Sequence, residues 1–374
     1  MSLSKIGGVP LRLVPIIGRS AVLAPARPVS CLFRLHLQKR CQHNGPPRFQ
    51  RKPQTPVPST TPLQSPRPDA VYQTRPDASE QPLILDDLQL PHKVRYLRPA
   101  IWALVVSGGI FTGLAYLQAR QELKPKKSHG WHEAPQWGAQ RRGPPTPTEL
   151  ATQWWAQLNP ISKLSSGIIA TNTAIHLSSF VIPQYWNLLW HMPARNVNYS
   201  LFSSMFVHSG PMHLFFNMYF TYNFMIPVGY SRAFEGNPYH VLSFFLATGT
   251  LSGFAQHWAT LITPQKRAIP EIFIRCGGAS GALLGMMGVF CMQYPTAGLG
   301  IMFVPIHFDA QYVLPAIMLF DFIGMVRGYS FVNFGHAAHL SGTIIGIAYS
   351  YLDGKNKIWN PLVNFWRRRL QQRS

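Results

Sequence analysis

The feature that most constrains the fold of this chain is a series of long stretches without a charged residue. A helix that spans a membrane needs about 20 mostly apolar residues, and a soluble all-α core does not account for so many uncharged runs in one chain. The charge-free runs are residues 99–119, 164–194, 196–231, 236–265, 276–308 and 328–352. Together with residues 311–327, the weakest candidate because Asp321 lies inside it, they predict seven spanning helices, near residues 100–118, 165–183, 205–228, 239–260, 278–294, 311–327 and 334–352.

The excess of basic residues is concentrated near the N-terminus. The chain has 34 Lys and Arg against 13 Asp and Glu, yet no acidic residue precedes Asp69. A basic, acid-free leader is typical of a mitochondrial transit peptide, and a disordered basic tail is the alternative. Because so much of the charge lies in residues 1–68, the high pI does not indicate a nucleic-acid partner. We expect a processing protease to cut within or after this leader.

Composition divides the rest of the chain. Residues 69–98 are rich in proline and predict a disordered linker. We therefore predict an all-α polytopic membrane protein, with one extra helix before a core of six. Its parts are an N-terminal helix at 99–119, a polar connection at 120–164, the six-helix core at 165–352 and a basic tail at 353–374.

Four polar side chains lie in the predicted third, fifth and seventh helices. Ser280 begins the fifth helix, His339 lies early in the seventh, and His213 and Asn217 lie in the third. Odd-numbered helices cross the membrane in the same direction, so these groups fall within roughly 3 to 12 Å of the same side. Polar residues inside a membrane are expensive and are functional candidates by default.

Small residues recur every fourth position in two of these helices, and this spacing lets membrane helices approach closely. The series are Gly277, Gly281 and Gly285, and Ala338, Gly342 and Gly346. Because Ser280 and His339 adjoin these faces, we expect a hydrogen bond between them. A histidine that takes the serine proton makes the hydroxyl a nucleophile. His213, Asn217 and the Ser280 backbone N–H are candidate oxyanion donors, and His208 is a candidate network residue.

Each of these residues has an alternative interpretation. Glycine and serine are common packing residues in membrane helices, and a lone histidine often makes a structural hydrogen bond. His336 and His339 are three residues apart and could ligate a metal. Asp321 could be a third catalytic member, but a structural partner such as Arg327, or a polar helix face, is the favoured interpretation.

Taken together, these motifs resemble those of the rhomboid intramembrane serine proteases over residues 165–352. The resemblance rests on Gly278-Ala279-Ser280-Gly281, on the spacing of His208, His213 and Asn217, and on Ala338-His339 followed by Gly342 and Gly346. It implies Ser280 as nucleophile and His339 as general base, in a dyad without an aspartate. It also implies His213 and Asn217 in the oxyanion hole, and no metal or cofactor.

The leader and the extra helix are similar to those of the mitochondrial branch of this family. That likeness implies cleavage of single-span proteins in the lipid bilayer of the inner mitochondrial membrane, with roles in quality control and apoptosis. It also implies an N-terminus in the matrix and a C-terminus in the intermembrane space, whereas counting Lys and Arg in the connections favours the reverse. We expect substrates with small or helix-breaking residues near one end of their span, because the cleaved peptide must unwind.

One position departs from the family pattern. Leu284 occurs where some members carry a tyrosine that stacks on the histidine, so His339 must be held differently. The first loop should be 184–204, with Trp186 and Trp190 at the interface, and 328–334 should form a gate.

Other classes of intramembrane protein fit less well. The only His-Glu pair, at His132, lacks the second histidine of a zinc protease. Asp321 is the only aspartate in a predicted span, whereas an aspartyl protease needs two. A transporter should show midplane ionisable sites or broken helices in paired repeats, and this sequence pattern indicates neither. A catalytically inactive rhomboid-like chaperone or scaffold remains the alternative function.

Overall fold

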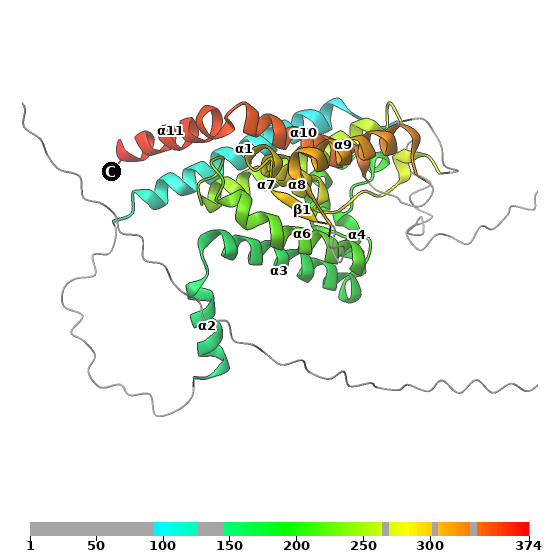
Figure 1. Ribbon diagram of the computed structural model, residues 1–374. Coiled ribbons are helices and arrows are strands. Elements are labelled where there is room, and N and C mark those ends of the chain that lie inside the picture. Colours follow the sequence, from blue (N-terminus) through cyan, green and yellow to red (C-terminus); the bar gives the residue numbers. More distant parts are fainter. Residues whose placement is uncertain (1–92, 126–144, 264–268, 301–305, 330–334, 374) are drawn as a thin grey trace, which may run out of the picture. The chain divides into compact units, whose positions relative to one another are not determined.

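The computed structural model describes residues 93–125, 145–263, 269–300, 306–329 and 335–373, all within one compact unit, Tyr72–Ser374. The predicted leader and nearly all of the predicted linker lie outside the described residues. The described part is mostly helical (Figure 1). Its α-helices are α1 Leu97–Glu122, α2 Pro147–Gln157, α3 Pro160–Val181, α4 Pro183–Leu189, α5 Ser200–Ser203, α6 Pro211–Gly229, α7 Pro238–Ala259, α8 Ser280–Gln293, α9 Ala310–Arg327, α10 His336–Tyr351 and α11 Asn360–Gln371.

The seven predicted helices correspond to α1, α3 and α6 to α10. Proline explains two shifted starts, because its fixed φ and missing N–H suit the first turn of a helix. Pro211 begins α6, six residues later than predicted, after the short helix α5 and the 3-10 turn η3 Ser204–Phe206. Pro160 begins α3, five residues before the predicted core, and the Asn159 side chain caps the helix by accepting from the Ser162 N–H at 2.8 Å.

Two of the described helices, α1 and α9, are long and apolar enough to cross a membrane, and α8 is apolar but has only 14 residues. The helical architecture fits a polytopic membrane protein, and the arrangement of one helix plus six stays a prediction. Large apolar side chains that face outward support this fit, since soluble monomers rarely expose large apolar patches. Phe180 on α3, Tyr222 on α6 and Phe322 on α9 are each at least half exposed.

Other regular elements were not predicted. The connection at 120–164 contains α2, whose N-terminus has a capping box between Thr146 and Glu149. The tail at 353–374 is largely helical, with the π-turn η5 Lys355–Trp359 and then α11. Both helices carry charged or polar residues, so a search for uncharged runs does not detect them. A short antiparallel pair, β1 Gly298–Gly300 with β2 His307–Asp309, precedes α9; it opposes Gly298 to Asp309 and makes the fold not strictly all-α.

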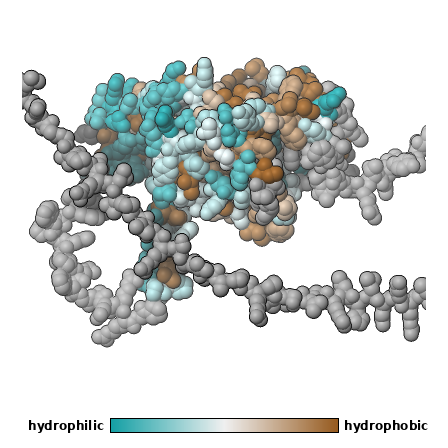
Figure 2. Space-filling view, viewed as in Figure 1, coloured by the Kyte–Doolittle hydropathy of each residue, from teal (hydrophilic) through white to brown (hydrophobic). Residues whose placement is uncertain are grey.

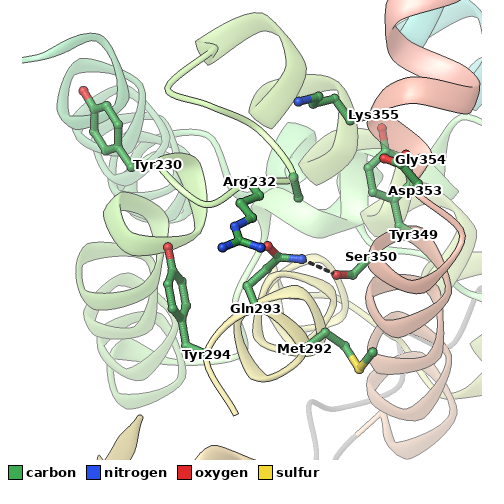
Figure 3. A pocket seen from close by; sticks show the side chains of 11 residues that line it. Tyr230, Arg232, Met292, Gln293, Tyr294, Tyr349, Ser350, Asp353, Gly354 and Lys355 are labelled. Atoms are coloured by element: carbon green, nitrogen blue, oxygen red, sulfur yellow. Dashed lines mark hydrogen bonds between the residues drawn. The ribbon is translucent and has the colours of Figure 1, made fainter. Parts of the chain in front are cut away.

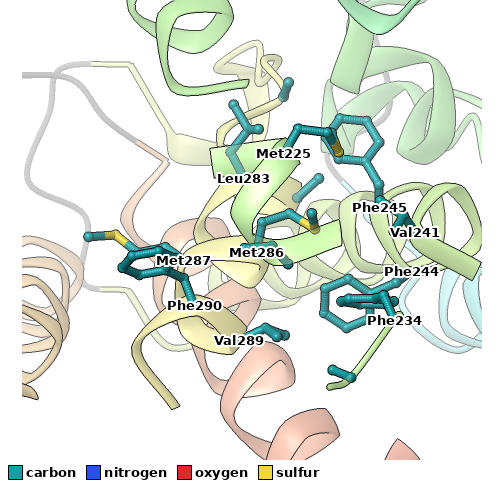
Figure 4. Packing of buried hydrophobic residues seen from close by; sticks show 14 of the residues in the cluster. Met225, Phe234, Val241, Phe244, Phe245, Leu283, Met286, Met287, Val289 and Phe290 are labelled. Atoms are coloured by element: carbon teal, nitrogen blue, oxygen red, sulfur yellow. The ribbon is translucent and has the colours of Figure 1, made fainter. Parts of the chain in front are cut away.

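The hydrophobic core surrounds α8, which packs against α6, α7 and α10. Figure 4 shows side chains from α6, α7 and α8, including Met225, Phe245 and Met286, interleaved in the largest buried cluster of the described residues. The extra helix α1 packs against α7 and α11, and in Figure 1 α11 runs beside it. Hydrophilic side chains gather toward this α1–α11 end on the face shown in Figure 2.

The contact between α8 and α10 is the closest in the core. A Cβ atom at Gly342 would collide with the Gly281 carbonyl oxygen, and one at Gly346 would collide with the Gly285 carbonyl oxygen. The small-residue spacing in the sequence therefore corresponds to a real approach of one backbone to the other. This contact fixes the distance between the first turns of the two helices.

Candidate active site

Ser280 and His339 come together at the N-terminal ends of α8 and α10. Ser280 is the first residue of α8 and His339 is the fourth residue of α10. The predicted hydrogen bond is present: Ser280 Oγ lies 2.7 Å from His339 Nε2. The Ser280 backbone N–H is in the first turn, where an α-helix provides no intrahelical acceptor. The site therefore combines a hydroxyl, a proton acceptor and a backbone donor.

The turn that leads into Ser280 is fixed by its backbone. Gly278 has a φ of +126°, a conformation that side chains other than glycine rarely adopt. Its N–H donates to the Ser204 carbonyl at 2.9 Å. Just before it, Cys276 and His191 exchange two backbone hydrogen bonds, of 2.7 and 3.1 Å. The segment 184–204 thus holds the turn that carries the serine.

His213 lies on the other side of that turn. A Cβ atom at Gly278 would lie 2.9 Å from His213 Nε2 and 3.8 Å from Ser280 Oγ, so both atoms border the same small space. The Ser209 backbone N–H donates to His213 Nδ1 at 3.4 Å. In a neutral ring the hydrogen must then be on Nε2. His213 therefore presents a donor to the space beside the serine hydroxyl.

The other two predicted network residues are placed differently. Asn217 lies one turn after His213, and its Nδ2 donates to the His213 carbonyl at 2.8 Å rather than to Ser280. Its Oδ1 is buried and has no hydrogen-bond partner among the described residues. His208 is fully buried, and its Nε2 accepts from the Ala279 N–H at 3.5 Å. His208 thus supports the residue that precedes the serine, and its role in a network around the site stays a prediction.

Sequence reasoning assigned the wrong partner to Asp321. The carboxylate is on α9 and points to α10, where Oδ1 lies 2.7 Å from His336 Nδ1 and 3.3 Å from His339 Nδ1. Asp321 itself is only 2% exposed. Leu284, at the position of the expected tyrosine, is part of the apolar packing and offers no hydrogen bond. The ring of His339 is therefore held between a serine and an aspartate.

No group of three or more His, Cys, Asp or Glu within the described ranges has an arrangement suited to a metal ion. This includes the His336 and His339 pair considered from sequence. The predicted gate at 328–334 and the His132-Glu133 pair fall wholly or mainly outside the described residues.

Trp190 and His191 belong to the packing of the first loop. Trp190 is buried against Gly277, and the ring of Trp186 packs edge-on against the ring of Trp190. His191 Nε2 lies 2.9 Å from His257 Nδ1, and His257 Nε2 donates to the Arg95 carbonyl at 2.8 Å. Burial, followed by the neighbouring His257, lowers the pKa of His191 to about 3. These bonds connect the loop with α7 and with the residues just before α1.

A polar cavity of about 600 Å³ lies at the other end of α8, bordered by Gln293 and Ser350, which are hydrogen-bonded at 2.7 Å. Figure 3 shows Arg232 and Tyr294 beside this pair. Gln293 is the last residue of α8 and Ser280 the first, and 14 residues of helix extend about 20 Å. This cavity is therefore separate from the Ser280 site.

Comparison with known proteins defines the class. Residues 195–356 match the Rhomboid domain family model, so this part of the chain is similar to a rhomboid domain. The chain is similar to mitochondrial presenilin-associated rhomboid-like proteins. It is 29% identical to the protein of Rattus norvegicus and 31% identical to protein A of Danio rerio, each over 222 residues. These alignments cover 57% of this chain and 55% and 54% of those relatives, so it spans about half of their length. With the Bos taurus protein the identity is 26% over 375 residues, covering 94% of this chain and 91% of that protein.

Proposed function

We propose that this protein is an intramembrane serine protease with Ser280 as nucleophile and His339 as general base. The observation that carries the proposal is the 2.7 Å hydrogen bond between Ser280 Oγ and His339 Nε2 at the N-terminus of α8. A serine is a poor nucleophile unless a base takes its proton, and this geometry supplies that base.

The reaction follows from the arrangement. Ser280 Oγ attacks the scissile carbonyl carbon while its proton moves to His339 Nε2, and the carbonyl electrons move onto the oxygen. That oxyanion is stabilised by the Ser280 backbone N–H and the His213 Nε2–H, with the free amide hydrogen of Asn217 as a third donor. His339 then gives the proton to the departing amine as the C–N bond breaks. Water hydrolyses the acyl-enzyme with the same histidine as base.

The substrates we propose are single-span membrane proteins cut within or near their span. Ser280 lies at the start of a helix, so the scissile bond would be reached near one membrane surface. The mitochondrial relatives support a location in the mitochondrion. We propose that the membrane is the inner one and that the protein has a role in quality control and apoptosis. We keep the predicted orientation, with the N-terminus in the matrix. Protease protection of a tag at the C-terminus, in mitochondria whose outer membrane is opened while the inner membrane stays intact, tests it.

The test of activity is cleavage of a tagged single-span substrate by the purified, reconstituted protein. We expect Ser280→Ala and His339→Ala each to reduce the rate about 1,000-fold or more, because each removes a member of one catalytic unit. Ser341→Ala is a matched control, since the Ser341 hydroxyl bonds the Ala338 carbonyl of its own helix. His307→Ala controls for histidine, because His307 is exposed on β2.

The outcomes separate the two functions. Loss of cleavage in the two site variants, with the controls active, supports the protease. Full activity in either site variant removes that residue from the mechanism. A wild-type protein that cuts none of several substrates, and does not react with a fluorophosphonate at Ser280, contradicts the protease and favours the inactive chaperone or scaffold.

A further inference from the structure

The polar cavity at the far end of α8 has no part in the proposed cleavage reaction. It lies where the C-terminal ends of α6, α8 and α10 meet, and two hydrogen bonds join these ends. The Tyr294 hydroxyl donates to the Pro227 carbonyl at 3.2 Å. Gln293 Nε2 donates to Ser350 Oγ at 2.7 Å, and both of these residues border the cavity of about 600 Å³. The cavity is therefore built from three helix ends.

The cavity contains an arginine whose charge is not balanced. Arg232 lies in the turn between α6 and α7, and its side chain extends toward Gln293 in Figure 3. Within the described part of the chain, Arg232 forms no ion pair. By contrast, the Lys355 ammonium at the edge of the cavity is paired with Glu235 at 2.6 Å. Arg232 therefore supplies a positive charge that is available to a ligand.

Two hydroxyl groups near Arg232 can add hydrogen-bond donors. The Ser350 oxygen accepts from Gln293, so the hydrogen of its hydroxyl remains for another acceptor. Tyr230 borders the same cavity and is about half exposed. A planar guanidinium with its N–H groups arranged as a fork matches the oxygens of a phosphate group, and hydroxyl donors complete such a site. The donors of this cavity therefore suit a phosphate.

One carboxylate also borders the cavity and restricts where an anion can lie. Asp353 is bonded to the loop that follows it, because the Asn356 side chain donates to Oδ2 at 2.8 Å and the Asn356 N–H donates to Oδ1 at 3.4 Å. Its negative charge repels an anion. A phosphate in the cavity would therefore lie beside Arg232 and away from Asp353.

The side chains around the cavity place it at the depth of lipid headgroups. Tyr351 and Leu352, at the end of α10, are 77% and 54% exposed. Tyrosines are enriched at the boundary between the hydrocarbon and the headgroups, because the ring is apolar and its tip is polar. Arg232 follows the half-exposed Tyr230 by two residues. The phosphate of a lipid and a free phosphate ion can both approach the cavity from this level.

We propose that this cavity is a phosphate-binding site, with Arg232 as its principal ligand and Ser350 as a second donor, at the end of α8 opposite Ser280. The ligand class is a phosphate anion, carried by a lipid headgroup or free in solution. The proposal does not depend on the proposed protease activity. A phosphate bound there would connect the α6–α7 turn with the ends of α8 and α10, and it would stabilise the folded protein by mass action.

The experiment titrates the purified full-length protein in a neutral detergent with phosphatidylglycerol, and native mass spectrometry measures the bound lipid. Zwitterionic phosphatidylcholine is the control lipid. We expect Arg232→Gln to weaken phosphatidylglycerol binding about tenfold, and Arg232→Lys about threefold, because lysine keeps the charge but loses the fork. Ser350→Ala should weaken binding about threefold through the loss of one donor. Arg120→Gln changes an exposed arginine in the last turn of α1, away from the cavity, and should equal wild type.

A second probe distinguishes the two sources of phosphate. Millimolar inorganic phosphate is added to the protein in the same detergent, and the unfolding temperature is measured. A rise in wild type that is absent in Arg232→Gln, with phosphatidylglycerol bound no better than phosphatidylcholine, identifies a free phosphate as the ligand. The reverse pattern identifies a lipid headgroup, and both patterns support the site.

The proposal is overturned if wild type binds neither probe, or if Arg232→Gln binds both probes as well as wild type does. It is also overturned if Arg120→Gln loses as much binding as Arg232→Gln, because basic residues in general, and not this cavity, would then attract the anion. The unfolding temperature without ligand checks that each variant is folded. If Arg232→Gln unfolds, the comparison of wild type with Arg232→Lys decides the outcome.

Discussion

His191 illustrates how one buried side chain makes stability depend on pH. It lies in the segment that pairs with Cys276 just before the serine turn, and its pKa is lowered to about 3 by burial and then by His257. The folded protein therefore keeps His191 neutral, whereas the unfolded chain takes up a proton near its ordinary value of 6.5. Stability from this group is complete above pH 6.5 and decreases as the pH falls toward 3.

We expect His191→Gln to reduce the loss of stability on acidification. Each pH unit below 6.5 costs the wild type about 1.4 kcal/mol at this residue, because the unfolded state binds the extra proton. Thermal unfolding in detergent between pH 7.5 and 5 measures the effect, with His307→Gln as the control on an exposed histidine. Parallel curves for wild type and His191→Gln would contradict it.

Motif spacing was sufficient to predict which residues border the serine, but not all of their partners. Ser280, His339 and His213 follow from small residues and histidines at helical spacing, and the structure brings them to one place. Asp321 was noticed as an acid inside an apolar helix, yet Arg327 was favoured as its partner. Nothing in the sequence shows which face of α9 turns toward α10, and the bond to His336 depends on that rotation.

The pair formed by α8 and α10 gives a prediction about an element. Gly342→Ala should lower the free energy of unfolding by about 1 to 3 kcal/mol, because the added Cβ atom meets the Gly281 carbonyl and must push the helices apart. We expect the activity of the proposed protease to fall as well. Gly109→Ala in α1 adds the same methyl group in open space and should have little effect. Equal unfolding temperatures for the two variants in detergent would show that the helices are not in tight contact.

Charge-free runs predict apolar helices well and others poorly. The helices α1, α3 and α7 to α10 occur within five residues of the predicted starts, whereas α2 and α11 were absent from the prediction. These two helices contain charged residues and are stabilised by an N-terminal cap or by an amphipathic face. Such helices are predicted from capping motifs and from hydrophobic periodicity, and not from charge-free runs. The strands β1 and β2 have three residues each, too few for a periodic signal.

At the scale of the whole molecule, the stability of the contact between α1 and α11 depends more on buried side chains than on charge. Trp359 is 1% exposed, stacks on His240 and donates to Gln118 Oε1 at 3.1 Å. Trp359→Ala should cost about 3 to 5 kcal/mol. Arg367→Gln should cost about 1 kcal/mol or less, since both side chains of its 2.6 Å ion pair with Glu122 are slightly more than a third exposed. Detergent unfolding and the rate of tryptic cleavage in α11 measure both, and equal losses would contradict the ranking.

The backbone contact between α8 and α10 has a consequence for how a substrate enters. Helices that meet through glycines cannot separate gradually, because the contact has no flexible side chains to stretch. Ser280 and His339 should therefore keep their relative positions when the neighbouring helices move. The helix α9 meets α10 through side chains such as Asp321 and His336, so it is better suited to swing outward. Such a swing would separate Asp321 from His339, and the hydrogen bond between them would form again only when α9 returned to α10.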